Sequence, residues 1–444
     1  MAVKLDKPLG RIAYVNARLL DPASGTDAPA SKAGGVLTDG EAIADWGPDI
    51  FKGGEPKDAT IIDCGGACIG PGLVDIRAHL GEPGAEQKET LATAGRAATA
   101  GGVTTLVCLP DTDPAIDDMS VVEFVARRAR QLGLTKVYPY GAVTKGLKGK
   151  ELAELGLLRG SGAIAFTDGV NSVADPQVLR QALSYAATFG LLICQRPEEP
   201  ALADGGAMNL GENATRLGLS GIPREAEIIM VERDIRLAAM TGGRLHFANV
   251  STSDSIEAIR AAKDRGLAIT CDTAPPYFAL NEMAIGDYRT FAKLSPPLRD
   301  EADRQAIVRA IADGVIDCIA SDHRPQDEEE KRLPFAQAAT GGIGLETLLP
   351  VMLELYHNNH LHLLQALALI SQKPADLMGL KAGRLATGAS ADLVVFDPDR
   401  SWKVDADKLN SKSKNSPFDG RPVQGLVLRT VIDGRTVHEH PSGG

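Results

Sequence analysis

Eight short apolar segments recur between about residue 72 and residue 322, and this repetition constrains the fold more than any other feature of the sequence. Most are separated by stretches such as KETLATAGRAATAG and DPQVLRQALSYAATFG, whose apolar residues recur at three- and four-residue steps, as in amphipathic helices. A strand followed by a helix, repeated eight times, predicts a parallel (β/α)8 barrel of the TIM type, an α/β fold. The segments are GLVDIRAHL, VTTLVCLP, KVYPYGAV, GAIAFTDG, LLICQRP, RLHFANVS, LAITCDTAP and IDCIASDH.

The two ends of the chain have a different pattern. Residues 10–70 and 383–439 hold short alternating segments separated by turn residues, for example RIAYVNARLLDPASG and GLVLRTVIDGRTVHE. Such alternation predicts strands. We therefore expect a small β-sandwich domain made from residues 1–65 and 379–444, beside a barrel formed by residues 66–378. The polar segment SKSKNSPFDGRP is expected to be an ordered loop that crosses back towards the barrel.

Composition and charge narrow the class of protein. The net charge is −11, from 47 basic and 58 acidic residues without a basic block, which argues against nucleic acid as a partner. No apolar run approaches the ~18 residues that a membrane span needs, and the first residues lack the apolar core of a signal peptide. The six cysteines are scattered, which favours free thiols in a reducing cytoplasm.

Polar residues gather where the predicted barrel strands end, and barrel enzymes place their chemistry there. In the first segment Asp75, Arg77 and His79 alternate, which predicts that all three side chains point to one face. Aspartate and histidine suit a metal ion, whereas arginine has no lone pair to donate. The other strand ends supply Asp111, Asp168, Arg196, His246, Asn249, Asp322 and His323.

Two further histidine positions have simpler interpretations. His246 lies two residues into the sixth strand, and we expect it to pack in the core. The segment HNNHLH (357–362) follows a helical stretch, and we expect a surface turn with helix capping.

Several long motifs carry a resemblance to a known family. PGLVDIRAHLGEPG is similar to PGLVDxHxHLREPG, and KETLATAGRAATAGGVTTLVCLPDTDP is similar to KETIxTGxxAAAAGGFTTVxxMPNTxP. GGAMNLGENATRLGLSGIPREAE, SPPLRDEADRQAI, GGIGLETLLP and SKSKNSPFDG match further signatures. These motifs are those of the dihydroorotases, within the cyclic amidohydrolase group of metal-dependent barrel hydrolases, and the chain resembles them over nearly its whole length. The resemblance implies the barrel and a sheet domain formed by both termini.

The resemblance fails at the positions that would bind metal. Family members hold one or two zinc ions through histidines of strands one, five and six and aspartates after strands four and eight. The resemblance places Arg77, Arg196 and Asn249 at three of the histidine positions. The retained positions are His79, Asp168 and Asp322.

The positions that would bind substrate are altered too. The family arginine that grips the substrate carboxylate corresponds to Gly81, and its asparagine partner corresponds to Asp111. The asparagine of NPPLR corresponds to Ser295, and the second histidine of DHAPH corresponds to Gln326.

We therefore expect no bound metal. A catalytic zinc normally needs three protein ligands and an open position, which only His79, Asp168 and Asp322 could supply. Two nearby guanidinium groups would repel a divalent cation, and their charge cannot be titrated away. We expect Arg77 to project into the barrel mouth against Asp322, Asp168 or both, with Arg196 sharing these carboxylates.

Three functional hypotheses follow. Some bacteria carry an inactive dihydroorotase-like chain that assembles with aspartate transcarbamoylase in pyrimidine biosynthesis, and our first hypothesis is such a structural subunit. The second is an active zinc-dependent dihydroorotase, which interconverts N-carbamoyl-L-aspartate and dihydroorotate with Asp322 as the catalytic proton shuttle. The third is an amidohydrolase with a changed substrate, in which the arginines bind an anion in place of zinc. In each case we expect a cytoplasmic homo-oligomer.

Overall fold

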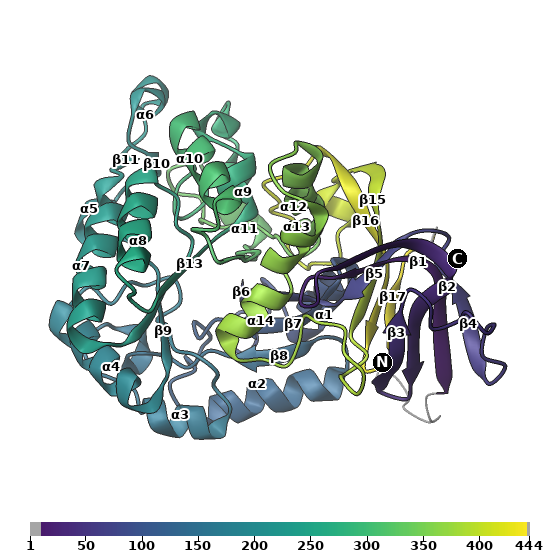
Figure 1. Ribbon diagram of the computed structural model, residues 1–444. Coiled ribbons are helices and arrows are strands. Elements are labelled where there is room, and N and C mark those ends of the chain that lie inside the picture. The colour runs from purple at the N-terminus through teal and green to yellow at the C-terminus, as the bar shows by residue number, and fades with distance from the viewer. Residues whose placement is uncertain (1–9, 442–444) are drawn as a thin grey trace.

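The computed structural model describes residues 10–441 and contains the predicted barrel (Figure 1). Its parallel strands pair in chain order. β6 pairs with β7 and β7 with β8; β9 pairs with β12, β12 with β13, and β13 with β14. The strands are β6 (Leu73–Ala78), β7 (Val103–Cys108), β8 (Lys136–Pro139), β9 (Leu192–Gln195), β12 (Arg244–Phe247), β13 (Ile269–Thr273) and β14 (Cys318–Ile319).

The fourth predicted strand, GAIAFTDG, is reduced to single bridges. Phe166 forms parallel bridges with Gly141 and with Ile193, and so connects the end of β8 to β9. Ala78 forms a parallel bridge with His323, which connects β6 to the segment after β14. The eight segments therefore close into a barrel in the predicted order.

Helices cover the outside of the barrel between successive strands (Figure 1). Local signals fix their ends: Asp175 caps the helix that begins at Pro176, and left-handed Gly190 terminates it. The helices of ten or more residues are α1 (Leu91–Ala100), α2 (Met119–Leu132), α4 (Pro176–Phe189), α7 (Glu225–Thr241), α8 (Ser253–Asp264), α10 (Glu301–Ala312) and α12 (Leu348–His357), and the seven-residue α3 (Leu155–Ser161) lies between α2 and α4 in the chain. None of the helices within residues 10–441 is long and apolar enough to cross a membrane.

Shorter elements occupy the connections. They are η1 (Lys145–Leu147), α5 (Pro200–Ala203), β10 (Met208–Asn209), α6 (Glu212–Leu217), β11 (Gly221–Ile222), α9 (Pro275–Ala279), η2 (Glu282–Ile285), η3 (Thr290–Ala292), α11 (Glu328–Arg332), α13 (Leu363–Leu369), α14 (Gln372–Met378) and η4 (Ala406–Lys408).

The two ends of the chain form a sheet beside the barrel, as the alternating patterns predicted (Figure 1). Its order is β17-β16-β15-β5-β1-β2-β3, and β4 also pairs with β1. β5 lies between β15 and β1, so it joins the two terminal segments into one sheet. The domain boundaries stay a prediction. The strands are β1 (Arg11–Asp21), β2 (Thr26–Asp39), β3 (Ala42–Gly47), β4 (Ala59–Asp63), β5 (Cys68–Pro71), β15 (Leu393–Lys403), β16 (Pro422–Ile432) and β17 (Arg435–Glu439).

Successive residues of a barrel strand point alternately into two apolar layers, one against the helices and one inside the barrel. One cluster joins Leu106 and Ile193 to the surrounding helices. The other joins their neighbours Val107 and Cys194 to one another and to Tyr140, and so fills the barrel interior. The barrel is thus a packed core, and its chemistry is confined to the mouth.

Candidate functional site: the barrel mouth

Arg77 projects into the barrel mouth, as expected, and forms an ion pair with Asp322. Its Nε donates to Asp322 Oδ1 at 3.0 Å, and one terminal nitrogen donates to the Gly169 carbonyl at 3.2 Å. The Arg77 side chain is 3% exposed and that of Asp322 is 13% exposed. One guanidinium therefore ties the first strand to the eighth strand and to the loop that follows the fourth.

The expected alternation of Asp75, Arg77 and His79 is broken in the structure. The pairing of β6 with β7 is irregular between Asp75 and Ala78, and Ile76, which lies between Asp75 and Arg77 in the chain, packs in the barrel interior. Asp75 instead accepts hydrogen bonds from the backbone and hydroxyl of Ser321. An extra residue in a strand redirects the side chains that follow it, which simple alternation does not anticipate.

His79 contacts a carboxylate at the mouth. Its Nδ1 lies 2.8 Å from Asp111 Oδ2. Burial by itself would raise the pKa of Asp111, but His79 and Arg324 bring that pKa below its usual value. The two positions that the resemblance assigns to metal and to substrate binding thus contact each other.

Asp168 is bound by the preceding loop. Its Oδ1 accepts from the backbone N–H groups of Val143 and Thr144 at 3.0 and 2.9 Å, and the Thr144 hydroxyl donates to Oδ2. Burial raises the pKa of Asp168 in spite of these donors. Of the two carboxylates expected to pair with Arg77, Asp322 forms the ion pair.

Arg196 does not share the carboxylates of Arg77, so that expectation was wrong. Its two terminal nitrogens donate to Glu198 at 3.1 and 3.0 Å, and one of them also donates to the Val170 carbonyl at 2.8 Å. The other donates to the Ser295 hydroxyl. Glu198 is two residues from Arg196 in the chain and neutralises its guanidinium. Arg196 therefore needs no carboxylate from across the barrel.

His246 lies within β12, and Asn249 lies two residues after the strand ends. Both nitrogens of His246 lie 2.9 Å from β13 side chains, those of Thr270 and Asp272, which confirms the packing interpretation. Asn249 is fully buried with φ +56°, and its backbone N–H donates to Asp272 at 2.6 Å. Neither polar atom of its side chain has a hydrogen-bond partner among residues 10–441.

Arg324 also lies at this mouth and was not predicted from the sequence. Burial lowers the pKa of Arg324, and the charges of Asp111, Arg196, Asp322 and Arg77 all act on its guanidinium. In the family motif DHAPH this position holds alanine, so the change from alanine to arginine in DHRPQ was an available signal. The mouth therefore contains three arginines.

The substrate positions have become part of the framework. Gly81 has φ +69°, and a Cβ there would lie 2.4 Å from the Glu89 carbonyl oxygen. Gln326 accepts from Lys88 at 2.9 Å and donates to the Thr340 carbonyl at 2.7 Å. Glu89 also holds the predicted return loop, because it accepts from the backbone N–H of Lys412 at 3.2 Å.

The histidine-rich segment 357–362 lies apart from these residues. His357 ends α12, and its Nε2 lies 3.0 Å from the Pro398 carbonyl oxygen. His360 and His362 are exposed. The segment is a turn between α12 and α13, as expected.

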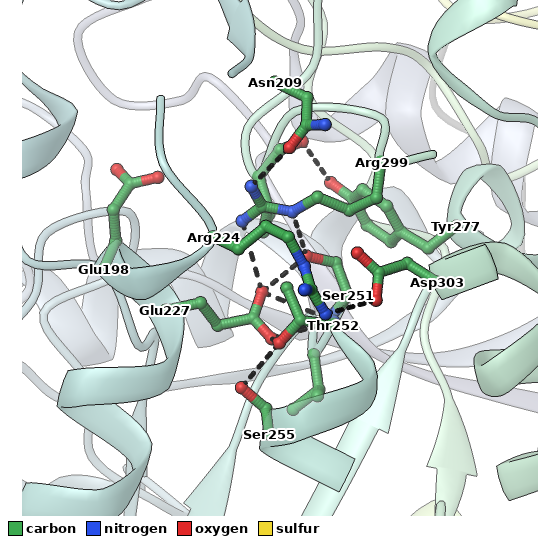
Figure 2. A network of polar contacts seen from close by, with 12 residues as sticks. Glu198, Asn209, Arg224, Glu227, Ser251, Thr252, Ser255, Tyr277, Arg299 and Asp303 are labelled. Atoms are coloured by element: carbon green, nitrogen blue, oxygen red, sulfur yellow. Dashed lines mark hydrogen bonds and ion pairs between the residues drawn. The ribbon is translucent and has the colours of Figure 1, made fainter. Parts of the chain in front are cut away.

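A second buried ionic cluster lies beside β12 (Figure 2). Glu227 of α7 accepts from the backbone and hydroxyl groups of Ser251 and Thr252, with Thr252 N at 3.0 Å and Thr252 Oγ1 at 2.8 Å. Arg299 lies 3.6 Å from Glu227 and donates to Ser251 Oγ and Asn209 Oδ1, each at 3.0 Å. This network holds the loop after β12 against α7.

The residues present do not fit a zinc ion. Within residues 10–441, no three His, Cys, Asp or Glu side chains are grouped so that they could hold a metal. The donor chemistry agrees: Asp322 is paired with a guanidinium, Asp168 accepts three donors, and His79 contacts Asp111. A cation at the mouth would meet the fixed charge of Arg77 at close range.

Comparisons with known proteins agree with this architecture. The protein resembles an L-hydantoinase (dihydropyrimidinase) from Arthrobacter aurescens, with a TM-score of 0.85 and 26% identity over 96% of each chain. It also shares the fold of a dihydropyrimidinase from Brevibacillus agri, with a TM-score of 0.83 and 24% identity, over 97% of this chain and 95% of that one. The model of the amidohydrolase family matches residues 214–437. The fold is that of an amidohydrolase, a class that is typically metal-dependent.

The relatives define the family more closely. A dihydro-orotase-like family model matches residues 66–255. The dihydroorotase of Anaplasma phagocytophilum is 44% identical over 96% of this chain and 95% of its own length, and that of Syntrophotalea carbinolica is 43% identical over 96% and 99%. The chain belongs to the dihydroorotase family. These names favour the active enzyme of our second hypothesis over the silent barrel of our first.

Proposed function

We propose that this chain is a catalytically silent member of the dihydroorotase family that serves pyrimidine biosynthesis as a structural subunit of an aspartate transcarbamoylase assembly. One observation carries the first part: the buried Arg77 guanidinium pairs at 3.0 Å with Asp322, the retained metal-position aspartate of the last strand. At 4 Å and an effective dielectric constant of about 20, each pair of unit charges interacts by about 4 kcal/mol. Arginine thus opposes a divalent ion here at every accessible pH.

The active enzyme remains the second candidate, because relatives named dihydroorotase are 41–46% identical to this chain over most of its length. In that case Asp322 would move a proton between the reacting groups. It would first have to leave Arg77, whose guanidinium has only one other acceptor among the described residues, the backbone carbonyl of Gly169. The freed guanidinium would then be buried without a counter-ion, at a cost of ~3–5 kcal/mol.

A turnover assay separates the two candidates. The purified protein, supplied with zinc, is assayed in both directions with N-carbamoyl-L-aspartate and dihydroorotate, with Asp322→Ala as the reference. We expect equal, background rates for both proteins. Turnover that Asp322→Ala abolishes would establish the enzyme and refute the silent barrel.

The assembly is tested separately. The chain is co-expressed with the aspartate transcarbamoylase of its own genome and analysed by size-exclusion chromatography at micromolar concentration. We expect co-elution at a larger size and a higher melting temperature than either part has alone, since a partner that binds the folded state stabilises it. Separate elution would contradict the subunit proposal. The free cysteines, with no disulfide among the described residues, support a cytoplasmic setting for this role.

A further inference from the structure

A cavity of about 790 Å³ lies where η3 and α11 meet residues 405–419, which include part of the return loop. The side chains of Arg77, Arg196 and Arg324 are not among its lining residues, so the cavity is separate from the cluster at the barrel mouth. Cavities of about 300–1,000 Å³ are the usual size of binding sites. We call this cavity and its rim the α11 groove.

Apolar side chains form much of the wall of the α11 groove. They are Tyr288, Phe291, Leu333, Pro334 and Phe335. Two of them reach the surface, because Tyr288 is 47% exposed and Leu333 is 44% exposed. The Tyr288 hydroxyl donates to the Leu217 carbonyl at 2.8 Å, which holds this side chain in place. An occupant that covers this rim as well as the interior has to extend along the surface, as a peptide segment does.

Lys331 holds the groove in shape. Its Nζ donates to the carbonyls of Thr290, Lys293 and Ala339 at 3.0, 3.4 and 2.7 Å, and so fixes α11 against η3. All three N–H groups of this lysine are used, which leaves none for an occupant. Burial lowers the pKa of Lys331 to about 7, so its charge is partly absent at neutral pH. The groove is thus preformed, which reduces the entropy cost of binding.

The other cations of the groove also have partners. The Nζ of Lys412 donates to one backbone carbonyl and that of Lys414 to two. The guanidinium of Arg332 is paired with Glu328. These contacts leave the basic side chains of the groove partly or fully engaged with the protein itself.

The carboxylates of the groove are freer. Five of them line it, against four cations. The Asp407 side chain has no hydrogen bond or ion pair among residues 10–441. Asp327 accepts through one oxygen only, from the backbone N–H of Glu329 at 2.9 Å. The charge that is left to attract an occupant is therefore negative, and it lies beside exposed apolar side chains.

We propose that the α11 groove docks a segment of a partner protein that presents an arginine next to an apolar residue. A guanidinium suits this surface because it donates to carboxylates such as Asp407 and also stacks on aromatic rings such as Tyr288. The apolar neighbour covers Leu333. Docking here requires no chemistry at the barrel mouth, and it does not depend on the identity of the partner.

Titrations of the full chain with short peptides test the groove. The probe is the blocked tripeptide acetyl-Leu-Arg-Leu-amide, and its controls carry glutamine or glutamate in place of the arginine. Saturation-transfer NMR at constant ionic strength measures binding. We expect a Kd of about 1 mM for the arginine peptide. The glutamine peptide should bind about threefold more weakly and the glutamate peptide more weakly still.

Two variants separate the apolar part of the groove from the charged part. Leu333→Ser should weaken the arginine and glutamine peptides alike, by about fivefold. Asp407→Asn should weaken only the arginine peptide, by about threefold. The matched controls are Leu157→Ser, an exposed leucine on α3, and Asp264→Asn, an exposed aspartate at the end of α8. Both control proteins should bind the peptides as the wild type does, and melting temperatures establish that each variant is folded.

Other occupants of the groove would give different results. Agmatine carries a guanidinium without apolar neighbours, and equal affinity for agmatine and the arginine peptide would mean a small-molecule site. A smaller species for Leu333→Ser than for the wild type in sedimentation velocity would mean that a second copy of the chain fills the groove. Either result, equal affinity for the three peptides, or unchanged binding by folded Leu333→Ser would overturn the proposal. None of these measurements uses dihydroorotate or a transcarbamoylase, so failure of the function proposed above would leave them unaffected.

Discussion

Two buried ionic clusters lie near the same end of the barrel and differ in how completely they are satisfied. Around Glu227, four donors from Ser251 and Thr252 reach one carboxylate, and Arg299 lies beside it (Figure 2). Around Arg77, one ion pair spans the barrel, while Asn249 has no side-chain partner among residues 10–441. The carboxylate of the first cluster is fully hydrogen-bonded, whereas the second cluster contains a buried amide without partners among residues 10–441.

The difference follows from what each cluster is required to do. Glu227 and Arg299 belong to the family-like motifs GIPREAE and SPPLR, and they fix loops whose burial the fold needs. Arg77 and Asn249 stand where the resemblance expects metal ligands. Replacing ligands removes chemistry without removing the fold, provided that every new buried charge finds a counter-ion. Arg77 found Asp322.

Removing Glu227 should have the largest effect on stability. Glu227→Ala leaves Arg299 buried without its carboxylate, and the expected loss is ~3–5 kcal/mol in the free energy of unfolding. Urea denaturation followed by circular dichroism measures this. Glu232→Ala, an exposed position on the same helix, should change stability by less than about 0.5 kcal/mol. Equal midpoints for the two variants would mean that the network is not structural.

Asp234, a third buried carboxylate, should make stability depend on pH. It lies on α7 with Glu227 and accepts from Gln195, the neighbour of Arg196, at 3.2 Å. Burial raises its pKa from 3.8 to about 6. Between these values the folded state binds the extra proton, so this contribution to stability is present below pH ~4 and is lost as the pH rises to ~6.

The corresponding variant is Asp234→Asn, which does not titrate. Its stability relative to the wild type should rise by about 3 kcal/mol between pH 4 and pH 7, from ~1.4 kcal/mol per pKa unit. Chemical denaturation of both proteins across this range gives the difference directly. A difference independent of pH would show that Asp234 has an ordinary pKa.

Arg77→Ala should cost less than Glu227→Ala, about 2 kcal/mol. The freed carboxylate of Asp322 is 13% exposed, so water can partly replace the lost guanidinium. A double-mutant cycle with Asp322→Ala isolates the coupling between the two side chains, which we expect to be about 1–2 kcal/mol. Additive effects of the two substitutions would contradict a direct ion pair.

Asn249→Gly should have the smallest effect and could increase stability by up to about 1 kcal/mol. Glycine accepts the φ of +56° at this position, and the substitution removes a buried amide without partners among the described residues. Ser251→Ala, two residues away, should instead cost about 1–2 kcal/mol because Glu227 loses a donor. A loss at Asn249 as large as that at Ser251 would mean that the amide has a structural role.

The sequence predicted the architecture well because the period of apolar residues reports burial directly. It predicted the Arg77–Asp322 contact because a buried arginine requires a carboxylate. It failed for the alternation of Asp75, Arg77 and His79, which an irregular strand pairing interrupts, and for Arg196, which pairs with Glu198 two residues away. Arg324 was not predicted, because its position in the family motif DHAPH holds alanine, which is not a ligand, and the substitution adds a charge instead of removing a ligand.

We infer that a guanidinium has replaced the metal, and the zinc content of the purified protein is the decisive measurement. Three proteins are expressed with added zinc and dialysed: the wild type, Arg77→His and the triple variant Arg77→His/Arg196→His/Asn249→His. Their zinc content is measured by inductively coupled plasma mass spectrometry. The account predicts far less than one zinc per chain in the wild type and in Arg77→His, because Arg196 and Asn249 still lack a nitrogen ligand there, and a gain only in the triple variant. One or more zinc ions per wild-type chain, lost in Asp322→Ala, would contradict it.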